Sequence, residues 1–263
     1  MQLPYYEVDA FTETVFAGNP AGVCILEAWL PPDRMQCIAA ENNFSETAFA
    51  VKEGDHYGLR WFTPKVEVDL CGHATLATAH VLLSHYEPSL ERVHFQTKSG
   101  ELIVEKRDGR LAMDFPSRMP EPCSAPAALV KGLGAKPKEV LRARDYMAVF
   151  ETEAEVRQLA PDFDKLGELD CLCIIVTARG MTADFVSRAF APAAGINEDP
   201  ATGSTHCTLT PYWAEKLGKR SLHAYQVSAR GGELFCEDRG DRCIIAGSAV
   251  IYLQGMITVP DIL

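Results

Sequence analysis

Residues 195–211 read G-I-N-E-D-P-A-T-G-S-T-H-C-T-L-T-P, and the centre of this stretch places the carboxylate of Asp199 on a turn fixed by the following proline. Thr202 is a residue type that caps helices, and a helical pattern follows Gly203 and Ser204, so the stretch predicts a helix that begins there. The first backbone N–H groups of such a helix carry partial positive charge and point back at the turn. We therefore expect a pocket that binds an anion beside an acidic side chain.

The first half of the chain repeats this arrangement. Residues 69–75, D-L-C-G-H-A-T, again place an acidic residue before a glycine that opens a helix. An R-x-F-x-P pattern precedes both stretches, at 60–64 and at 188–192. A G-E-L segment follows both, and residues 100–110 match the segment 132 positions later at six of eleven positions. The common order and the near-constant offset indicate an internal duplication.

Short strand patterns dominate the rest of the chain. They predict strands at 5–11, 23–26, 45–51, 59–62, 66–68, 93–98, 101–106, 110–115, 146–151, 169–177, 185–190, 221–228, 233–237, 243–247 and 250–253. Helices are predicted at 31–41, 72–85, 127–132, 153–159 and 203–217, with a kink at Pro211 and a tight turn at 18–22. The helix at 72–85 is apolar almost all round, which indicates that it is buried.

These elements predict an α+β fold of two pseudo-symmetric halves, each a rolled, mostly antiparallel sheet around one buried helix. Four prolines between residues 116 and 126 mark the linker. We assign residues 1–117, with a C-terminal strand in 250–263, to the first half and residues 118–249 to the second.

Composition excludes several classes of protein. The chain has 263 residues, of which 47% are hydrophobic, enough for a full core. A net charge of −11 argues against non-specific binding to nucleic acid or to an anionic membrane. No apolar run is long enough to span a membrane and no signal peptide is recognisable, so we expect a cytoplasmic protein. Neither a Gly-x-Gly-x-x-Gly nor a Walker sequence is present, and we expect no cofactor.

Nine cysteines, an odd number, indicate reduced and mostly buried thiols. Cys171 and Cys173 lie in the strand predicted at 169–177. A zinc site made from Cys71, His73, His206 and Cys207 is disfavoured, because Cys207 directly follows His206 and adjacent residues make poor ligand pairs. We therefore expect no metal site.

Four residues are candidates for chemistry. Glu46 lies where a helix gives way to a strand, and a carboxyl shielded from water there would have a raised pKa and could move a proton. His73, at a helix start, should be neutral because the helix dipole disfavours its cation. Asp199 and Ser204 flank the second helix start. The plainer alternatives are a surface glutamate, a buried structural histidine, a turn former and a helix-start residue.

Four segments carry a resemblance to a known family: residues 19–22 (N-P-A-G), 45–47 (S-E-T), 71–75 (C-G-H-A-T) and 198–204 (E-D-P-A-T-G-S). Together they resemble the phenazine-biosynthesis PhzF-like family. The resemblance implies the diaminopimelate-epimerase-like fold, with a cleft between the halves, and usually a homodimer. It implies cofactor-independent isomerisation of a small carboxylated metabolite, with Glu46 as proton carrier and His73, Asp199 and Ser204 in support. On these motifs we expect substrate contacts from Asn19, Ser45, Gly72, Thr202 and Gly203.

One departure from the wider superfamily bears on mechanism. Its epimerases and racemases use two cysteines, and Ala77 and Thr202 stand at the aligned positions of this sequence. Inversion by two thiols is therefore disfavoured, and alkylating agents should leave activity largely intact. A single carboxylate can instead remove a proton and return it to another carbon on the same face. The alternative is a protein of the same fold that binds small acids or a partner without catalysis.

Overall fold

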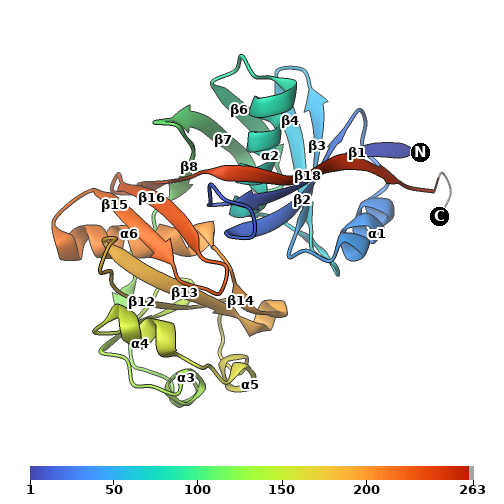
Figure 1. Ribbon diagram of the computed structural model, residues 1–263. Helices are drawn as coiled ribbons and strands as arrows, with labels where there is room; N and C mark the ends of the chain where they lie inside the picture. The colour runs from blue at the N-terminus through green and yellow to red at the C-terminus, as the bar shows by residue number, and fades with distance from the viewer. Residues whose placement is uncertain (261–263) are drawn as a thin grey trace. The chain divides into compact units, whose positions relative to one another are not determined.

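The structure, a computed structural model, describes residues 1–260, and these form two compact units (Figure 1). Unit 1 comprises residues 1–114 and the chain from 246 onward, and unit 2 comprises residues 115–245. The chain leaves unit 1 within β8 (Arg110–Pro116) and returns within β17 (Arg242–Gly247). The last three residues of the strand region predicted at 250–263 lie outside the described residues.

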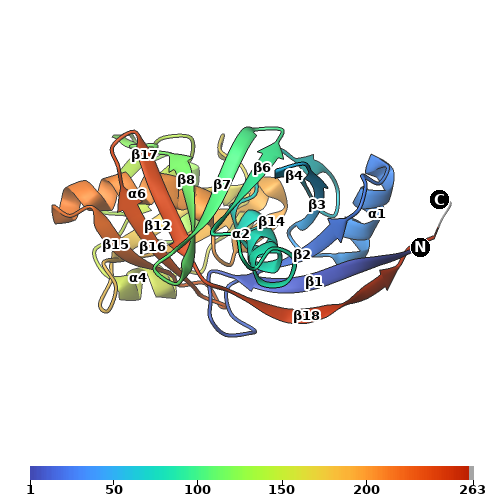
Figure 2. The ribbon, with the colours of Figure 1, turned by 90° about the horizontal axis from the view of Figure 1, so that it is seen from above.

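Unit 1 is built on a sheet, and its first strand in chain order is β1 (Gln2–Ala10), which has a paired strand on each side (Figure 2). The other strands are β2 (Asn19–Leu26), β3 (Thr47–Glu53), β4 (His56–Phe62), β5 (Glu67–Val68), β6 (Arg92–Thr97), β7 (Gly100–Arg107), β8 and β18 (Ala249–Thr258). Most neighbours are antiparallel, and only the β2–β3 and β4–β6 pairs of the described ladders of this unit are parallel. The sheet is therefore mostly antiparallel, as predicted.

The helix α2 (Gly72–Val81) is the buried centre of unit 1. It packs against β1, β2, β3 and β18. Leu76, Ala77 and Ala79 are completely buried, which explains why this helix is apolar on all sides. The chain continues as a π-helical turn, Leu82–Tyr86, where the sequence predicts more of the same helix. A second helix, α1 (Pro32–Asn42), ends at Asn43, whose φ of 55° is a left-handed cap.

Unit 2 is built in the same way. Its strands are β9 (Glu121–Pro122), β10 (Glu139–Arg142), β11 (Tyr146–Val149), β12 (Ile174–Arg179), β13 (Phe185–Ala191), β14 (Ile196–Asp199), β15 (Ser221–Gln226), β16 (Gly232–Asp238) and β17. Its helices are α3 (Ala127–Leu133), α4 (Glu153–Gln158), α5 (Phe163–Leu166), the single 3₁₀ turn Pro192–Ala194 and the buried α6 (Gly203–Leu217). Three strands, β9, β10 and β14, were not predicted from the sequence, because they are only two to four residues long.

The two units share one pairing scheme. In unit 1, β2 pairs in parallel with β3, which pairs antiparallel with β4, and β4 pairs in parallel with β6. In unit 2, β11, β12, β13 and β15 follow the same parallel, antiparallel, parallel order. The α+β fold of two similar halves is therefore confirmed.

The R-x-F-x-P repeats form the same contacts in both units. The guanidinium of Arg60 donates two hydrogen bonds to Glu67, at 2.7 and 2.9 Å. Arg188 and Glu198 repeat this bidentate pair at 2.7 and 2.9 Å. Each guanidinium also lies over the phenylalanine of its motif, at 5.3 and 4.9 Å from the ring centroid. The motif therefore anchors the short strand that precedes each buried helix.

Two of the predicted elements are wrong. Residues 19–22 of the tight turn predicted at 18–22 are instead the start of β2, and Gly18 precedes the strand with a φ of 64°. Gly22 is needed for packing, because a Cβ there would lie 2.9 Å from the Thr47 hydroxyl. The strand predicted at 169–177 begins only at Ile174, so Cys171 and Cys173 precede it. The carboxylate of Asp145 accepts the backbone N–H groups of residues 172 and 173, which holds this segment in a bend.

The buried helix of unit 2 runs through Pro211. A proline has no backbone N–H, so the carbonyl of Cys207 lacks its partner within the helix. The backbone N–H of Arg118 donates to that carbonyl at 2.9 Å. The linker segment thus supplies the hydrogen bond that the proline removes, which allows one continuous α6.

Candidate functional site

Two sequence-predicted residues meet in unit 1. Glu46 is the last residue before β3, and His73 is the second residue of α2. The backbone carbonyl of Glu46 accepts the N–H of Gly22 at 3.3 Å, which fixes its position beside β2. Glu46 Oε2 lies 3.4 Å from His73 Nε2, with 14% and 6% of the side chains exposed. The two atoms are within reach of each other but are not aligned as a hydrogen bond.

His73 is neutral at pH 7, because burial lowers its pKa to about 4. Neutrality agrees with the sequence analysis, although the cause is loss of water and not the helix dipole. The second ring nitrogen, Nδ1, lies 3.5 Å from the sulfur of Cys71. The imidazole therefore stands with a carboxylate at one nitrogen and a thiol at the other.

Cys71 is the third member of this cluster, and its place beside Glu46 and His73 was not predicted from the sequence. It is 7% exposed, and one ligand atom each from Glu46, Cys71 and His73 lie within 4.8 Å of one another. The zinc site disfavoured above combined Cys71 and His73 with His206 and Cys207, which belong to unit 2. The feature of the sequence that could have predicted this pair is the spacing of two residues between Cys71 and His73 at a helix start. Nothing in the sequence shows that Glu46 joins them.

The second predicted cluster is a hydrogen-bonded turn in unit 2. The hydroxyl of Thr202 donates to the carboxylate of Asp199. The side chain of Gln226, which is completely buried, accepts the Thr202 N–H at 2.8 Å. The Gln226 amide donates to the Asp199 carbonyl at 2.7 Å and to the Thr202 hydroxyl at 3.0 Å. Gln226 therefore closes the turn that carries Asp199, and the sequence analysis did not identify it.

Thr202 is the N-cap residue of α6 by position, but its side chain does not cap the helix. The hydroxyl donates its hydrogen bond to Asp199 instead, so the prediction that Thr202 caps the helix through its side chain is wrong. The Thr202 carbonyl instead accepts the Thr205 hydroxyl at 2.9 Å and contacts His206 Nδ1 at 2.8 Å. Within the described chain no hydrogen bond engages the half-buried hydroxyl of Ser204, so it is available to a ligand.

The position of Glu46 in unit 1 is taken by Cys173 in unit 2. Each residue directly precedes the strand whose first residue pairs with the phenylalanine of the R-x-F-x-P motif. Cys173 is 5% exposed, and burial, with Asp145 and Asp199 nearby, raises the pKa of its thiol well above the usual value. Unit 2 therefore has no base at neutral pH where unit 1 has a carboxylate.

The predicted site residues thus divide between the two units. Glu46, His73, Asn19, Ser45 and Gly72 belong to unit 1. Asp199, Thr202, Gly203 and Ser204 belong to unit 2. Asn19 is fully buried at the start of β2, and Gly72 and Gly203 open the two buried helices.

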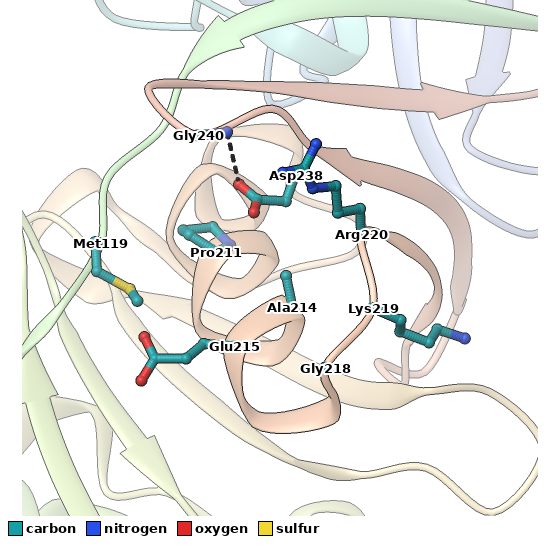
Figure 3. Close-up of a pocket in the computed structure, with 9 residues that line it drawn as sticks. All are labelled: Met119, Pro211, Ala214, Glu215, Gly218, Lys219, Arg220, Asp238 and Gly240. Atoms are coloured by element: carbon teal, nitrogen blue, oxygen red, sulfur yellow. Dashed lines mark hydrogen bonds between the residues drawn. The ribbon is translucent and has the colours of Figure 1, made fainter.

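The hollow drawn in Figure 3 lies elsewhere, at the C-terminal end of α6. Its volume is about 490 Å³, and it is lined by Pro211 within the helix, by Gly218 directly after it, and by Arg220 and Asp238. The Asp238 carboxylate accepts the N–H of Gly240 at 3.1 Å. The hollow contains none of the predicted site residues. Two hollows of unit 1, of about 410 and 330 Å³, contain none of the predicted residues either.

Comparison with known proteins gives consistent results. The sequence pattern of the family described as "Phenazine biosynthesis-like protein" matches residues 8–255. A Pseudomonas aeruginosa protein named "Uncharacterized isomerase" is 52% identical over 257 residues, which is 98% of this chain and 99% of that protein. The crystal structure of a PhzF family protein from Enterococcus faecalis is 50% identical, with a TM-score of 0.96 over 98% of this chain and 100% of that chain.

A more distant comparison concerns the fold alone. The crystal structure of a hydroxyproline epimerase from Agrobacterium vitis is 12% identical, with a TM-score of 0.60 over 97% of this chain and 91% of that chain. The epimerase-like fold is therefore confirmed. Among the described residues, no helix is long and apolar enough to cross a membrane.

Proposed function

This chain belongs to the phenazine biosynthesis-like protein family, and we propose that it catalyses a cofactor-independent proton shift on a small carboxylated metabolite. Close relatives named isomerases and the epimerase fold place the chain among isomerase-type enzymes. The observation that carries the proposal is the contact between Glu46 and His73, at 3.4 Å, at the start of a buried helix.

Glu46 is proposed as the only proton carrier. Its carboxylate removes a proton from one carbon, the C–H electron pair moves into a neighbouring conjugated system, and the same carboxyl returns the proton to another carbon. Atoms and electrons balance without a redox or metal cofactor. Cys173, at the equivalent position of unit 2, supports a one-base reaction, because its raised pKa makes it a poor second base.

His73 is proposed to orient Glu46 and the substrate. A neutral imidazole can donate one hydrogen bond and accept another, so it can serve Glu46 in both the ionised and the protonated form. The free N–H groups of a helix start stabilise negative charge that develops on the substrate.

Asp199 and Ser204 are proposed to bind the substrate. The hydrogen bonds from Thr202 and Gln226 hold Asp199 in one orientation, and the Ser204 hydroxyl is available to a substrate oxygen. Gly203 opens α6, and its N–H is one of the first that the helix leaves without an internal partner. We also propose substrate contacts from Asn19, Ser45, Gly72 and Thr202, and this part of the proposal rests on the family motifs alone.

The test is a screen of small carboxylated metabolites for deuterium uptake from D₂O, followed by Glu46→Gln. We expect the variant to lose at least ~100-fold in exchange rate, because a positioned acid/base group contributes about 10²–10⁴. Glu41→Gln, an exposed residue of α1, is the matched control. Exchange retained in Glu46→Gln on a true substrate would remove Glu46 as proton carrier. Binding without exchange in the wild-type protein would favour the non-catalytic alternative.

We also propose a homodimer in the cytoplasm. Unit 1 exposes Phe16, Tyr252, Leu253 and Met256, and β18 contains no charged residue. Exposed apolar side chains gathered on one strand often mark an interface. Light scattering should give a mass twice that of one chain. The double variant Tyr252→Lys, Met256→Lys should have the mass of a single chain. A wild-type monomer at micromolar concentration would contradict the proposal.

A further inference from the structure

We propose that Glu46, Cys71 and His73 form a site for one thiophilic divalent cation, such as Zn²⁺, and that the bound ion blocks the proton transfer. The blocking part rests on the proposed function, whereas the binding part does not. Three kinds of metal-ligating side chain meet at one place in unit 1: a carboxylate, a thiol and an imidazole. Zinc is bound by these three types of group.

The distances suit a tetrahedral ion. Bonds of about 2.0 Å to nitrogen and oxygen at the tetrahedral angle separate the two ligand atoms by about 3.3 Å. Glu46 Oε2 and His73 Nε2 are 3.4 Å apart. One atom from each of the three side chains lies within 4.8 Å of the others, and the Cys71 sulfur lies 3.5 Å from Nδ1 of the imidazole. The Cys71 side chain must therefore rotate toward Nε2 to reach the separation of roughly 3.6 Å that sulfur and nitrogen have when both bind one zinc ion.

The charges also balance. When the ion binds, the Cys71 S–H bond breaks, the sulfur bonds to the metal, and the proton leaves to the buffer. The thiolate and the Glu46 carboxylate then neutralise the two positive charges of the ion, which allows it to be held by side chains that are mostly buried. The partial positive charge at the start of α2 opposes binding, so the thiolate is essential.

Three protein ligands leave the fourth position of a tetrahedral ion open to water or to a substrate oxygen. The positive charge of the ion lowers the basicity of both oxygens of the bound Glu46 carboxylate, so Glu46 no longer accepts a proton from the substrate. The cation therefore inhibits the isomerase and does not assist it.

Binding is measured on the full-length, metal-free protein without any substrate. Cys37 is an exposed thiol, so Cys37→Ser is the parent for every variant. Calorimetry with Zn²⁺ should show one ion per chain, and Cd²⁺ should give thiolate-to-metal charge-transfer absorbance. Cys71→Ser should abolish the absorbance, and Cys71→Ser and Glu46→Gln should each weaken Zn²⁺ binding at least tenfold. Cys123→Ser, a partly buried thiol of unit 2, should change neither signal.

Unchanged affinity in Cys71→Ser or Glu46→Gln would overturn the site, as would the absence of any ion bound to the parent. Circular dichroism checks that each variant is folded, and Glu46→Gln, at a partly exposed residue, keeps the test valid if a buried variant unfolds. With a substrate found, Zn²⁺ should stop deuterium exchange and a chelator should restore it. If exchange is lost in Glu46→Gln but bound Zn²⁺ does not affect it in the parent protein, the proposed function stands. The proposal that the ion blocks proton transfer would then be wrong.

Discussion

Glu46 and Cys173 occupy equivalent positions in the two units, each directly before the strand that pairs with the R-x-F-x-P strand. One is a partly exposed carboxylate, and the other is a buried thiol whose pKa burial raises. The duplicated fold thus carries different chemistry at one position. This asymmetry is the physical basis for proposing one proton carrier.

The first prediction concerns that asymmetry. Cys173→Ser should keep deuterium exchange within about twofold of wild type, while burial of a hydroxyl should lower the free energy of unfolding by about 1–3 kcal/mol. Exchange kinetics and urea denaturation measure the two effects. A folded Cys173→Ser protein with a 100-fold slower exchange would reveal a second base in unit 2.

The second prediction concerns Gln226, which makes three hydrogen bonds to the Asp199 turn. Gln226→Met should leave the Thr202 N–H and the Asp199 carbonyl without these partners. The expected loss in free energy of unfolding is about 1–3 kcal/mol per buried group left unsatisfied, measured by denaturation. Gln254→Met, at an exposed residue of β18, is the control and should change stability by less than ~0.5 kcal/mol. Equal stability of the two variants would contradict this assignment.

The third prediction concerns the Arg60–Glu67 pair. The hydrogen bonds from Arg60 lower the pKa of Glu67 to about 2. An ordinary glutamate in the unfolded chain has a pKa of about 4.3, so between these values only the unfolded state binds the proton. Stability from Glu67 is therefore fully present above this window and is lost as the pH falls through it.

The measurement is the free energy of unfolding of wild type and Glu67→Gln between pH 7 and pH 2. The difference between the two proteins should be largest near pH 7 and should shrink below pH 4.5, because the glutamine does not titrate. A difference that is constant over this range would show that the ion pair does not control the carboxyl.

The fourth prediction concerns the buried helix of unit 1. Leu76 is completely buried, and Leu76→Ala should destabilise the protein by about 2–5 kcal/mol through the cavity it leaves. Leu90→Ala is the control, since Leu90 is 42% exposed and should have a much smaller effect. Thermal or urea unfolding measures both. Comparable losses at the two positions would show that α2 is not the core of its unit.

Much of the architecture follows from local pattern. Short sequence segments that recur at a near-constant offset indicate two similar halves, because a duplicated sequence repeats its strand and helix patterns in the same order. The helix that follows Gly72 is apolar on every side, and a helix with this composition is stable only when it is buried on every side. The errors fall where tertiary contacts override local signals. Asn19 opens a strand despite its turn-forming neighbours, and Asp145 bends an apolar segment by accepting two backbone N–H groups.

The sequence by itself determined the α+β fold, its duplication, the family and the identity of Glu46, His73, Asp199 and Ser204 as candidates. Only the tertiary structure brought Glu46 within 3.4 Å of His73, added Cys71 to the pair and showed Gln226 holding Asp199. The physical reason is the distance along the chain between the residues that take part in each feature. Periodicity and helix starts are encoded within a few residues, whereas the Glu46–His73 and Gln226–Asp199 contacts each join residues 27 positions apart through the packing of strands around a buried helix.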